Sequence, residues 1–321
     1  MVRGSPILFI TGARIGDAIL SSGLLKVLVD ENPDARITVA AGPASAPLFT
    51  EAPAVDRVIV LEKRRFGGHW FSLWRQTRKT RWGAVVDLRG SGLSRFLRTR
   101  RRAVLKRGPS PEHKVIEAAR LIRLEDAPPS PFLFMSPETD ARAKALTAGA
   151  GPILAMAPGA NWLGKTWPVE RFSQVAQRLL GPGGPLAGGR LMILGGEDDG
   201  ERARALRDVV PRKRLIDLTG KADLLTAYAA LKHARLFIGN DSGAMHLAAA
   251  AGVPTLGLFG PSDEALYGPW GPLGRAVRGP RDFAQIRAVD PGFSQALCHM
   301  MDLPAAKVIA GAQALLAETE A

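Results

Sequence analysis

The segment Leu236–Ser262, LFIGNDSGAMHLAAAAGVPTLGLFGPS, decides the fold of this chain. Its apolar run Leu236–Gly239 predicts a buried strand, and the small residues after Gly243 predict a helix that packs closely on a sheet. A second apolar run, Thr255–Phe259, predicts the next strand. A strand, a helix and a strand in this order form a βαβ unit, which places parallel strands side by side.

The start of the helix in this segment is a candidate anion site. Backbone amides at a helix N-terminus and the hydroxyl of Ser242 are suited to bind phosphate. Gly243 lets a ligand approach the backbone, and His246 lies one turn further on the same face. A lone histidine is more often structural. Together, however, Asp241, Ser242, Gly243 and His246 predict a site for a diphosphate.

The same alternation of strands and helices extends over the chain. Further apolar runs predict strands at Pro6–Thr11, Arg36–Ala41, Arg57–Leu61, Ala84–Leu88, Ile153–Ala157, Arg190–Leu194 and Arg214–Asp217. Helical spacing predicts helices at Asp17–Val29, Val169–Leu180, Glu201–Val209, Leu224–Lys232 and Gly243–Ala251. We therefore expect an α/β protein with two doubly wound, Rossmann-like domains, residues 1–150 and 151–321, and a ligand cleft between them. Packing of the last helix on the first domain is compatible with this expectation.

Three further positions follow predicted strands and carry chemistry. Asp17 opens the first helix after a glycine turn, where a carboxylate also suits the helix dipole. Lys165 precedes the helix of the second domain, where its ammonium group suits a phosphate. The acidic residues Glu197, Asp198 and Asp199 follow a strand that ends in two glycines, and such a carboxylate suits ribose hydroxyls. For each position, an ordinary helix-capping or solvated role is the alternative.

Positive charge is concentrated in one block of the first domain. Residues 57–107 contain 16 Lys and Arg against only Glu62 and Asp87, a balance of +14 in a chain whose net charge is +13. Such a block suits a polyanion or an acidic membrane surface. Phe66, Trp70, Phe71 and Trp74 recur in it at helical spacing. They predict either a helix that faces the core or a helix that contacts anionic lipid.

The cysteine content and the lengths of the apolar segments indicate the cell compartment in which the protein works. The single cysteine, Cys298, excludes an internal disulfide and suits a reducing compartment. The apolar run at the N-terminus is too short for a signal peptide, and the longest apolar stretch is interrupted by glycines, His246 and Pro254. We expect a cytoplasmic protein, with a peripheral contact on the inner face of the inner membrane as a further expectation.

The segment Gly239–Pro261 strongly resembles the bacterial heptosyltransferases of glycosyltransferase family 9, which have the GT-B architecture. Weaker similarities follow in the family's order along nearly the whole chain. They lie at residues 12–25 (GARIGDAILSSGLL), 85–90 (VVDLRG), 158–172 (PGANWLGKTWPVERF), 194–206 (LGGEDDGERARAL) and 298–308 (CHMMDLPAAKV).

The resemblance implies an inverting, metal-independent transfer of a sugar from a nucleotide diphosphate donor, with ADP-heptose favoured, to a lipopolysaccharide core precursor of the lipid A and Kdo type. Asp17 matches the family's proposed general base, and Lys165 matches its phosphate ligand. The remaining donor contacts match Glu197, Gly220, Lys221, Asp241, Ser242, Gly243 and His246. No cofactor is implied. The segment PGAN at 158–161 differs from the threonine-rich residues of some members, which leaves the donor sugar open.

The basic block is assigned to the acceptor, with Lys63, Arg64 and Arg65 as its contacts and no nucleic acid expected. Two alternatives stay open. One is a nucleotide-sugar epimerase with the same architecture, which would isomerise the sugar and not transfer it. The other is a non-catalytic protein that binds nucleic acid or lipid through its basic surface, which salt-dependent binding without transfer would reveal.

Overall fold

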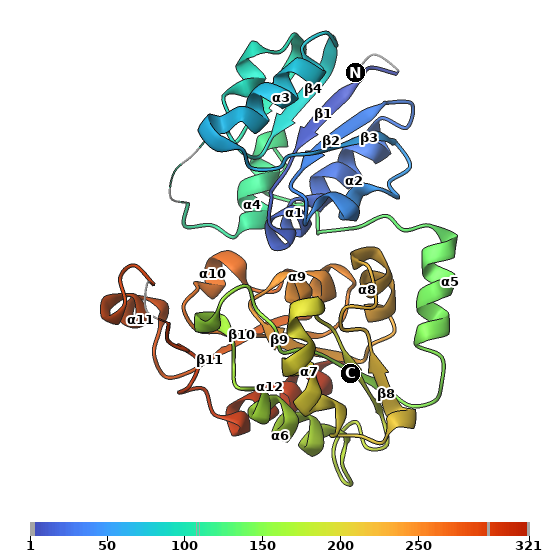
Figure 1. The fold of residues 1–321 in the computed structure, drawn as a ribbon, viewed down its shortest axis with the longest axis vertical. Coiled ribbons are helices and arrows are strands. Elements are labelled where there is room, and N and C mark those ends of the chain that lie inside the picture. Colours follow the sequence, from blue (N-terminus) through green and yellow to red (C-terminus); the bar gives the residue numbers. More distant parts are fainter. Residues whose placement is uncertain (1–3, 107, 109, 294–295, 320–321) are drawn as a thin grey trace. The chain divides into compact units, whose positions relative to one another are not determined.

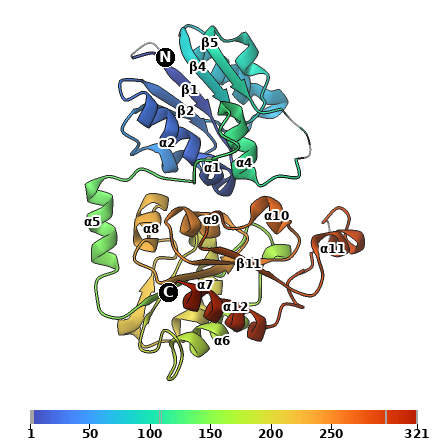
Figure 2. The ribbon, with the colours of Figure 1, turned by 180° about the vertical axis from the view of Figure 1, so that it is seen from behind.

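The computed structural model describes residues 4–106, 108, 110–293 and 296–319. The chain forms two compact units, Met1–Ser136 and Pro137–Ala321, each built around its own sheet (Figures 1 and 2). Every strand pairing in the described residues is parallel. The predicted fold class, α/β with two doubly wound halves, is confirmed.

The first unit is a five-stranded sheet in the order β3-β2-β1-β4-β5. Its strands are β1 (Ile7–Ile10), β2 (Ile37–Ala41), β3 (Val55–Val60), β4 (Trp82–Asp87) and β5 (Thr99–Val104). Its helices are α1 (Ile15–Leu20), α2 (Ser22–Glu31), α3 (Gly68–Thr77) and α4 (Lys114–Ala119). The central strand β1 is fully buried, as an apolar strand covered on both faces must be.

The second unit is a six-stranded sheet in the order β11-β10-β9-β6-β7-β8. Its strands are β6 (Ile153–Ala157), β7 (Arg190–Ile193), β8 (Leu215–Asp217), β9 (Leu236–Asn240), β10 (Thr255–Phe259) and β11 (Gly274–Arg278). Its helices are α5 (Pro137–Leu146), α6 (Val169–Leu180), α7 (Gly200–Arg207), α8 (Leu224–Leu231), α9 (Gly243–Ala250), α10 (Glu264–Tyr267), α11 (Phe283–Val289) and α12 (Ala305–Glu318).

Helices cover both faces of the second sheet. Figures 1 and 2 show α6 and α12 together on one face and α8 and α9 on the other. The buried ring of Trp167, just before α6, belongs to the same core, and its Nε1 donates to the carbonyl oxygen of Leu303, just before α12, at 3.0 Å. No helix in the described part of the chain is long and apolar enough to cross a membrane.

The predicted elements match the structure closely, with two kinds of difference. The strand β6, the strand β10 and the helix α6 have the predicted bounds. The edge strands β5 and β11 were not predicted, because their arginines break the apolar pattern of a buried strand. The single helix predicted at Asp17–Val29 is divided into α1 and α2 at Ser21, whose hydroxyl donates to the carbonyl oxygens of Asp17 and Ala18.

The boundary between the two units lies near, but not at, residue 150, where the sequence predicts the domain boundary. Helix α5 packs on α8 and therefore belongs to the second unit, which begins at Pro137. The last helix, α12, for which packing on the first domain was allowed, lies against α6 and the strands β9–β11.

One carboxylate joins α5 to α8. Asp223 is the N-cap of α8, and its side chain accepts a hydrogen bond from the backbone N–H of Thr226 at 2.8 Å. The same carboxylate lies 3.4 Å from Arg142 of α5. Burial alone would raise the pKa of Asp223, but the hydrogen bonds from Thr226 and the charge of Arg142 outweigh it and lower that pKa.

We predict that Asp223→Ala lowers the free energy of unfolding by about 1 kcal/mol at neutral pH, the usual cost of losing an N-cap. A lowered pKa means that the contribution is present above the unfolded pKa of about 3.9 and is lost as the pH falls through the folded pKa. Urea unfolding at pH 7 and pH 3 measures both effects. The control is Asp208→Ala at the end of α7, because the side chain of Asp208 makes no hydrogen bond in the described structure. An equal loss in both variants would contradict the capping role.

Candidate functional site

The carboxyl ends of β6 and β9 meet at the centre of the second sheet. The chain adds β7 and β8 on one side of β6, and then β9, β10 and β11 on the other side. The loops after β6 and β9 therefore leave the sheet in opposite directions. Doubly wound folds bind their ligands at this kind of reversal, so the predicted anion site lies at the position that the topology favours.

Three polar side chains from three strand ends converge there. Lys165, in a short 3₁₀ turn (Leu163–Lys165) after β6, places its Nζ 2.5 Å from Oδ2 of Asp241. Ser262, after β10, donates its hydroxyl to the same oxygen at 2.6 Å. Asp241 is almost completely buried, and its carboxylate is tolerated because an ammonium and a hydroxyl compensate it.

The N-terminus of α9 offers further donors beside this group. Ser242 is its N-cap, yet the hydroxyl makes no capping hydrogen bond. Oγ of Ser242 is buried and has no hydrogen-bond partner among the described residues. A buried hydroxyl without a partner is costly and calls for an explanation such as a ligand. His246 lies one turn further, buried, with Nε2 3.9 Å from Oδ1 of Asp241. The structure thus brings together five of the predicted donor residues, with Gly243 as the first residue of α9.

A fully buried asparagine fixes the loop that carries Lys165. The amide Nδ2 of Asn240 donates to the carbonyl oxygen of Pro158 at 2.8 Å. Its Oδ1 accepts from the backbone N–H of Trp167 at 3.2 Å. Pro158 and Trp167 stand at the two ends of the loop, so one side chain of β9 holds both ends in place.

The structure separates the two candidate ribose acids. Asp199 accepts from the backbone N–H of Gly196 at 3.0 Å and pairs with Arg202 at 3.1 Å, which gives its carboxylate a local structural role. Glu197 is exposed, and its carboxylate has neither a hydrogen-bond nor an ion-pair partner in the described residues. Gly220, with φ +66°, lies against it, so that a Cβ at 220 would be 3.2 Å from Cγ of Glu197. Glu197 and Gly220 are therefore neighbours, and their roles toward the donor stay predictions.

In the first unit, Asp17 occupies the corresponding reversal between β1 and β4. It lies exposed in the first turn of α1, directly after the loop that leaves β1. Gly12 permits this approach, since a Cβ at position 12 would meet Cβ of Asp17 at 2.6 Å. Ser45 holds the loop by donating to the carbonyl oxygen of Gly12 at 2.8 Å. The loop therefore presents a carboxylate at the carboxyl edge of the sheet.

With this geometry established, comparison with known proteins identifies the family. The model of glycosyltransferase family 9 (heptosyltransferase) matches residues 72–285. The chain belongs to this family. A lipopolysaccharide heptosyltransferase 2 of Escherichia coli K12 is 24% identical over 98% of this chain and 99% of its own length.

Two solved structures share the fold. The E. coli ADP-heptose lipopolysaccharide heptosyltransferase II superimposes with a TM-score of 0.76 at 22% identity, over 98% of this chain and 100% of its own. An E. coli heptosyltransferase in complex with ADP-2-deoxy-2-fluoro heptose has a TM-score of 0.66 at 17% identity, over 98% and 100%. The protein is thus a glycosyltransferase with the GT-B architecture, as the sequence predicts.

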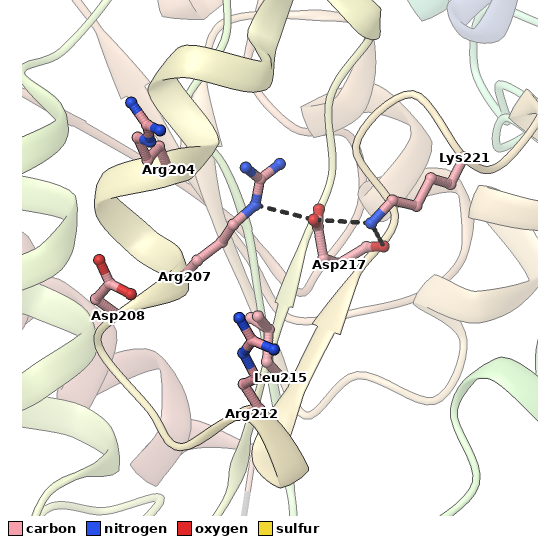
Figure 3. A pocket seen from close by; sticks show the side chains of 7 residues that line it. All are labelled: Arg204, Arg207, Asp208, Arg212, Leu215, Asp217 and Lys221. Atoms are coloured by element: carbon pink, nitrogen blue, oxygen red, sulfur yellow. Dashed lines mark hydrogen bonds and ion pairs between the residues drawn. The ribbon is translucent and has the colours of Figure 1, made fainter.

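Lys221 of this glycosyltransferase lies apart from the Lys165 group. Its Nζ is 3.0 Å from Oδ2 of Asp217, which also pairs with Arg207 at 2.9 Å. Figure 3 shows this carboxylate between the two cations, at one side of a cavity of about 640 Å³ beside β8. Burial would raise the pKa of Asp217, but the hydrogen bonds from Lys221 and Thr219 and the charge of Arg207 lower it. The Lys221 ammonium thereby contacts the end of β8, and its predicted contact with the donor stays a prediction.

The basic block of this glycosyltransferase divides into structurally different parts. The arginines of β5 lie on an edge strand, where charge prevents pairing with another sheet, and Arg102 donates to the carbonyl oxygens of Ser94 and Leu97. Lys63, Arg64 and Arg65 are exposed after β3. This second part lies outside the sheet. Arg107 lies outside the described residues.

The aromatic residues of the block also divide. Trp70 and Trp74 of α3 pack against the core of the first unit together with the buried Leu73. Phe71 is 64% exposed, and Phe66, which precedes α3 with φ +52°, is fully exposed. The core interpretation is confirmed for Trp70 and Trp74, whereas Phe66 and Phe71 are exposed and their contact with lipid stays a prediction.

Sequence reasoning missed Asn240 and Ser262, although both are neighbours of predicted residues in space. Asn240 directly precedes Asp241, and its position at the end of a buried strand was the available signal. Ser262 lies 21 residues from Asp241, and only the parallel order of β9 and β10 reveals that they meet. No group of three or more His, Cys, Asp or Glu side chains is placed to hold a metal ion in the described structure.

Proposed function

We propose that this glycosyltransferase moves heptose from ADP-heptose to a lipopolysaccharide core precursor, with inversion at the anomeric carbon and without a metal ion. The observation that carries the proposal is the group at the carboxyl ends of β6 and β9, where Lys165 meets Asp241 beside the N-terminus of α9. The names of the relatives supply the sugar and the acceptor, since they act on lipopolysaccharide and one is bound to an ADP-heptose analogue.

The donor diphosphate is proposed to bind at the start of α9. Backbone N–H groups there point away from the helix, and the helix dipole favours an anion. The Lys165 ammonium adds a positive charge, and the buried hydroxyl of Ser242 gains the partner that it lacks. These fixed charges stabilise the negative charge that develops on the leaving ADP. Glu197, beside Gly220, is the proposed acceptor of hydrogen bonds from the ribose hydroxyls.

Asp17 is the proposed general base. A hydroxyl oxygen of the acceptor attacks the anomeric carbon of the heptose, and the bond from that carbon to the diphosphate oxygen breaks. ADP leaves with the electron pair, while the hydroxyl proton passes to the carboxylate of Asp17. Attack from the side opposite the leaving group inverts the anomeric centre. The exposed position of Asp17 in the first turn of α1 is compatible with direct contact to a large acceptor.

The acceptor is proposed to be held by Lys63, Arg64 and Arg65 on the first unit. Lipopolysaccharide precursors carry phosphates and carboxylates, and three exposed cations in sequence suit them. The exposed rings of Phe66 and Phe71 follow directly. Exposed aromatic side chains beside basic ones are typical of proteins that rest on an anionic lipid surface. We therefore infer a peripheral contact of this region with the membrane that carries the acceptor.

We predict that Lys165→Met weakens the binding of ADP by about tenfold or more, because a charge-assisted contact to phosphate is lost. Isothermal titration measures the affinity. The matched control is Lys307→Met on α12, an exposed lysine that makes no ion pair in the described residues. Transfer from ADP-heptose should proceed undiminished in excess chelator. Unchanged ADP affinity in Lys165→Met, or loss of transfer on chelation, would contradict the proposal.

We predict that Asp17→Asn lowers kcat by about 10²-fold or more and leaves ADP affinity unchanged, since a general base contributes at least this factor. Steady-state transfer kinetics and titration of ADP separate the two quantities. Asp34→Asn, in the same unit and remote from the carboxyl edge of the sheet, is the control. A variant that turns over at the wild-type rate would remove Asp17 from the mechanism.

We predict that replacing Lys63, Arg64 and Arg65 by Gln raises the acceptor KM and leaves the donor KM unchanged. The difference should shrink with added salt, because exposed charges are screened beyond about 8 Å at physiological ionic strength. In flotation experiments, the wild-type protein should bind anionic vesicles and the double variant Phe66→Ser/Phe71→Ser should not. Neither protein should bind neutral vesicles. The control for charge is Arg100→Gln/Arg101→Gln on β5. Equal effects of both charge variants would show that net charge alone acts.

A further inference from the structure

The turn that carries Lys165 is held from outside the site by a buried pair near the end of the chain. His299 and Asp290 are 3% and 1% exposed, and Nε2 of His299 lies 3.3 Å from Oδ2 of Asp290. No step of the proposed reaction uses either residue. The backbone of His299 is fixed as well, because its carbonyl oxygen accepts from the guanidinium of Arg281 at 3.3 Å, and Arg281 pairs with Asp302.

The segment around His299 contacts the residues on both sides of Lys165. The backbone N–H of His299 donates to the carbonyl oxygen of Gly164 at 3.2 Å. The thiol of Cys298 donates to the carbonyl oxygen of Thr166 at 3.0 Å. The carbonyl groups of the residues before and after Lys165 are thereby held by two successive residues of one segment, which is more than 130 residues away in the chain.

The side chain of His299 also fixes the shape of the turn through aromatic contacts. The ring of Trp162 packs edge-on to His299, with 6.1 Å between the centroids, and Phe293 packs on both rings. The Trp162 ring in turn covers Gly164 so closely that a Cβ at 164 would overlap it. The backbone path into Lys165 therefore depends on where the His299 imidazole is placed.

We propose that Asp290 and His299 are positioning residues for the donor diphosphate. Asp290 fixes the orientation of the His299 ring, and His299 and its neighbour Cys298 hold the turn from which Lys165 reaches the end of β9. The inference rests on the proposed role of Lys165 in donor binding. Buried ionisable pairs add little net stability compared with apolar residues of the same size, so a geometric role accounts for this pair better than a stabilising one.

A double-mutant cycle between Asp290 and Lys165 tests the inference. We expect Asp290→Asn to weaken ADP binding by about fivefold when Lys165 is present and by less than twofold in the Lys165→Met background. Groups that act through one another show this non-additivity, whereas independent sites add. Isothermal titration of ADP with the four full-length proteins measures the cycle. His299→Asn should behave as Asp290→Asn does.

The control separates positioning from general destabilisation. Asp223→Ala removes the cap of α8, a helix outside the Lys165 turn, and should lower Tm without a change in ADP affinity. Equal effects of Asp290→Asn with and without Lys165, or no effect on affinity, would overturn the inference. If Lys165→Met itself left ADP affinity unchanged, the proposed donor site would be wrong. Failure of the donor site is thus distinguishable from failure of the positioning role.

Discussion

The reversal of strand order between β6 and β9 is the constraint on which the second unit depends. A parallel sheet points all its carboxyl ends to one edge, and the reversal sends the neighbouring loops apart at its centre. Lys165, Asp241 and Ser262 come from the ends of three different strands, yet they share one carboxylate oxygen. No local sequence preference could bring them together. The order of the strands in the sheet therefore brings these three side chains together.

Charge in the two units is arranged in different ways. In the second unit, the charges at the site compensate each other, as Lys165 and the buried Asp241 do. In the first unit, Lys63, Arg64 and Arg65 are exposed in succession, and only Glu62 is adjacent in the chain. Compensated buried charges suit a small ligand that must be oriented, whereas an exposed excess suits the attraction of a large polyanion. This difference agrees with a small donor and a large anionic acceptor.

Much of the fold could be predicted from the sequence because each buried strand is a run of mainly apolar residues. The apolar runs of β6 and β10 and the amphipathic pattern of α6 gave their bounds directly. The edge strand β5, with arginine at 100, 101 and 102, could not be found in this way, since an edge strand needs no apolar face and gains from charge. Of the site, Asp241, Ser242 and His246 could be predicted because one helix N-terminus joins them. Ser262 and the pair Asp290–His299 could not, because their partners are set by sheet order and by loop packing.

The Lys165 turn illustrates how a flexible side chain gains a defined position. A lysine side chain has many rotamers, and its ammonium is a point charge without directional preference. Asp241 holds the ammonium at one end. At the other end, Asn240 fixes the two ends of the loop, and His299 fixes the peptide before Lys165. With both ends held, fewer conformations remain to be lost when the diphosphate binds, which lowers the entropic cost of binding. If Lys165 contacts the donor diphosphate as proposed, the buried residues behind the turn contribute to donor affinity without touching the donor.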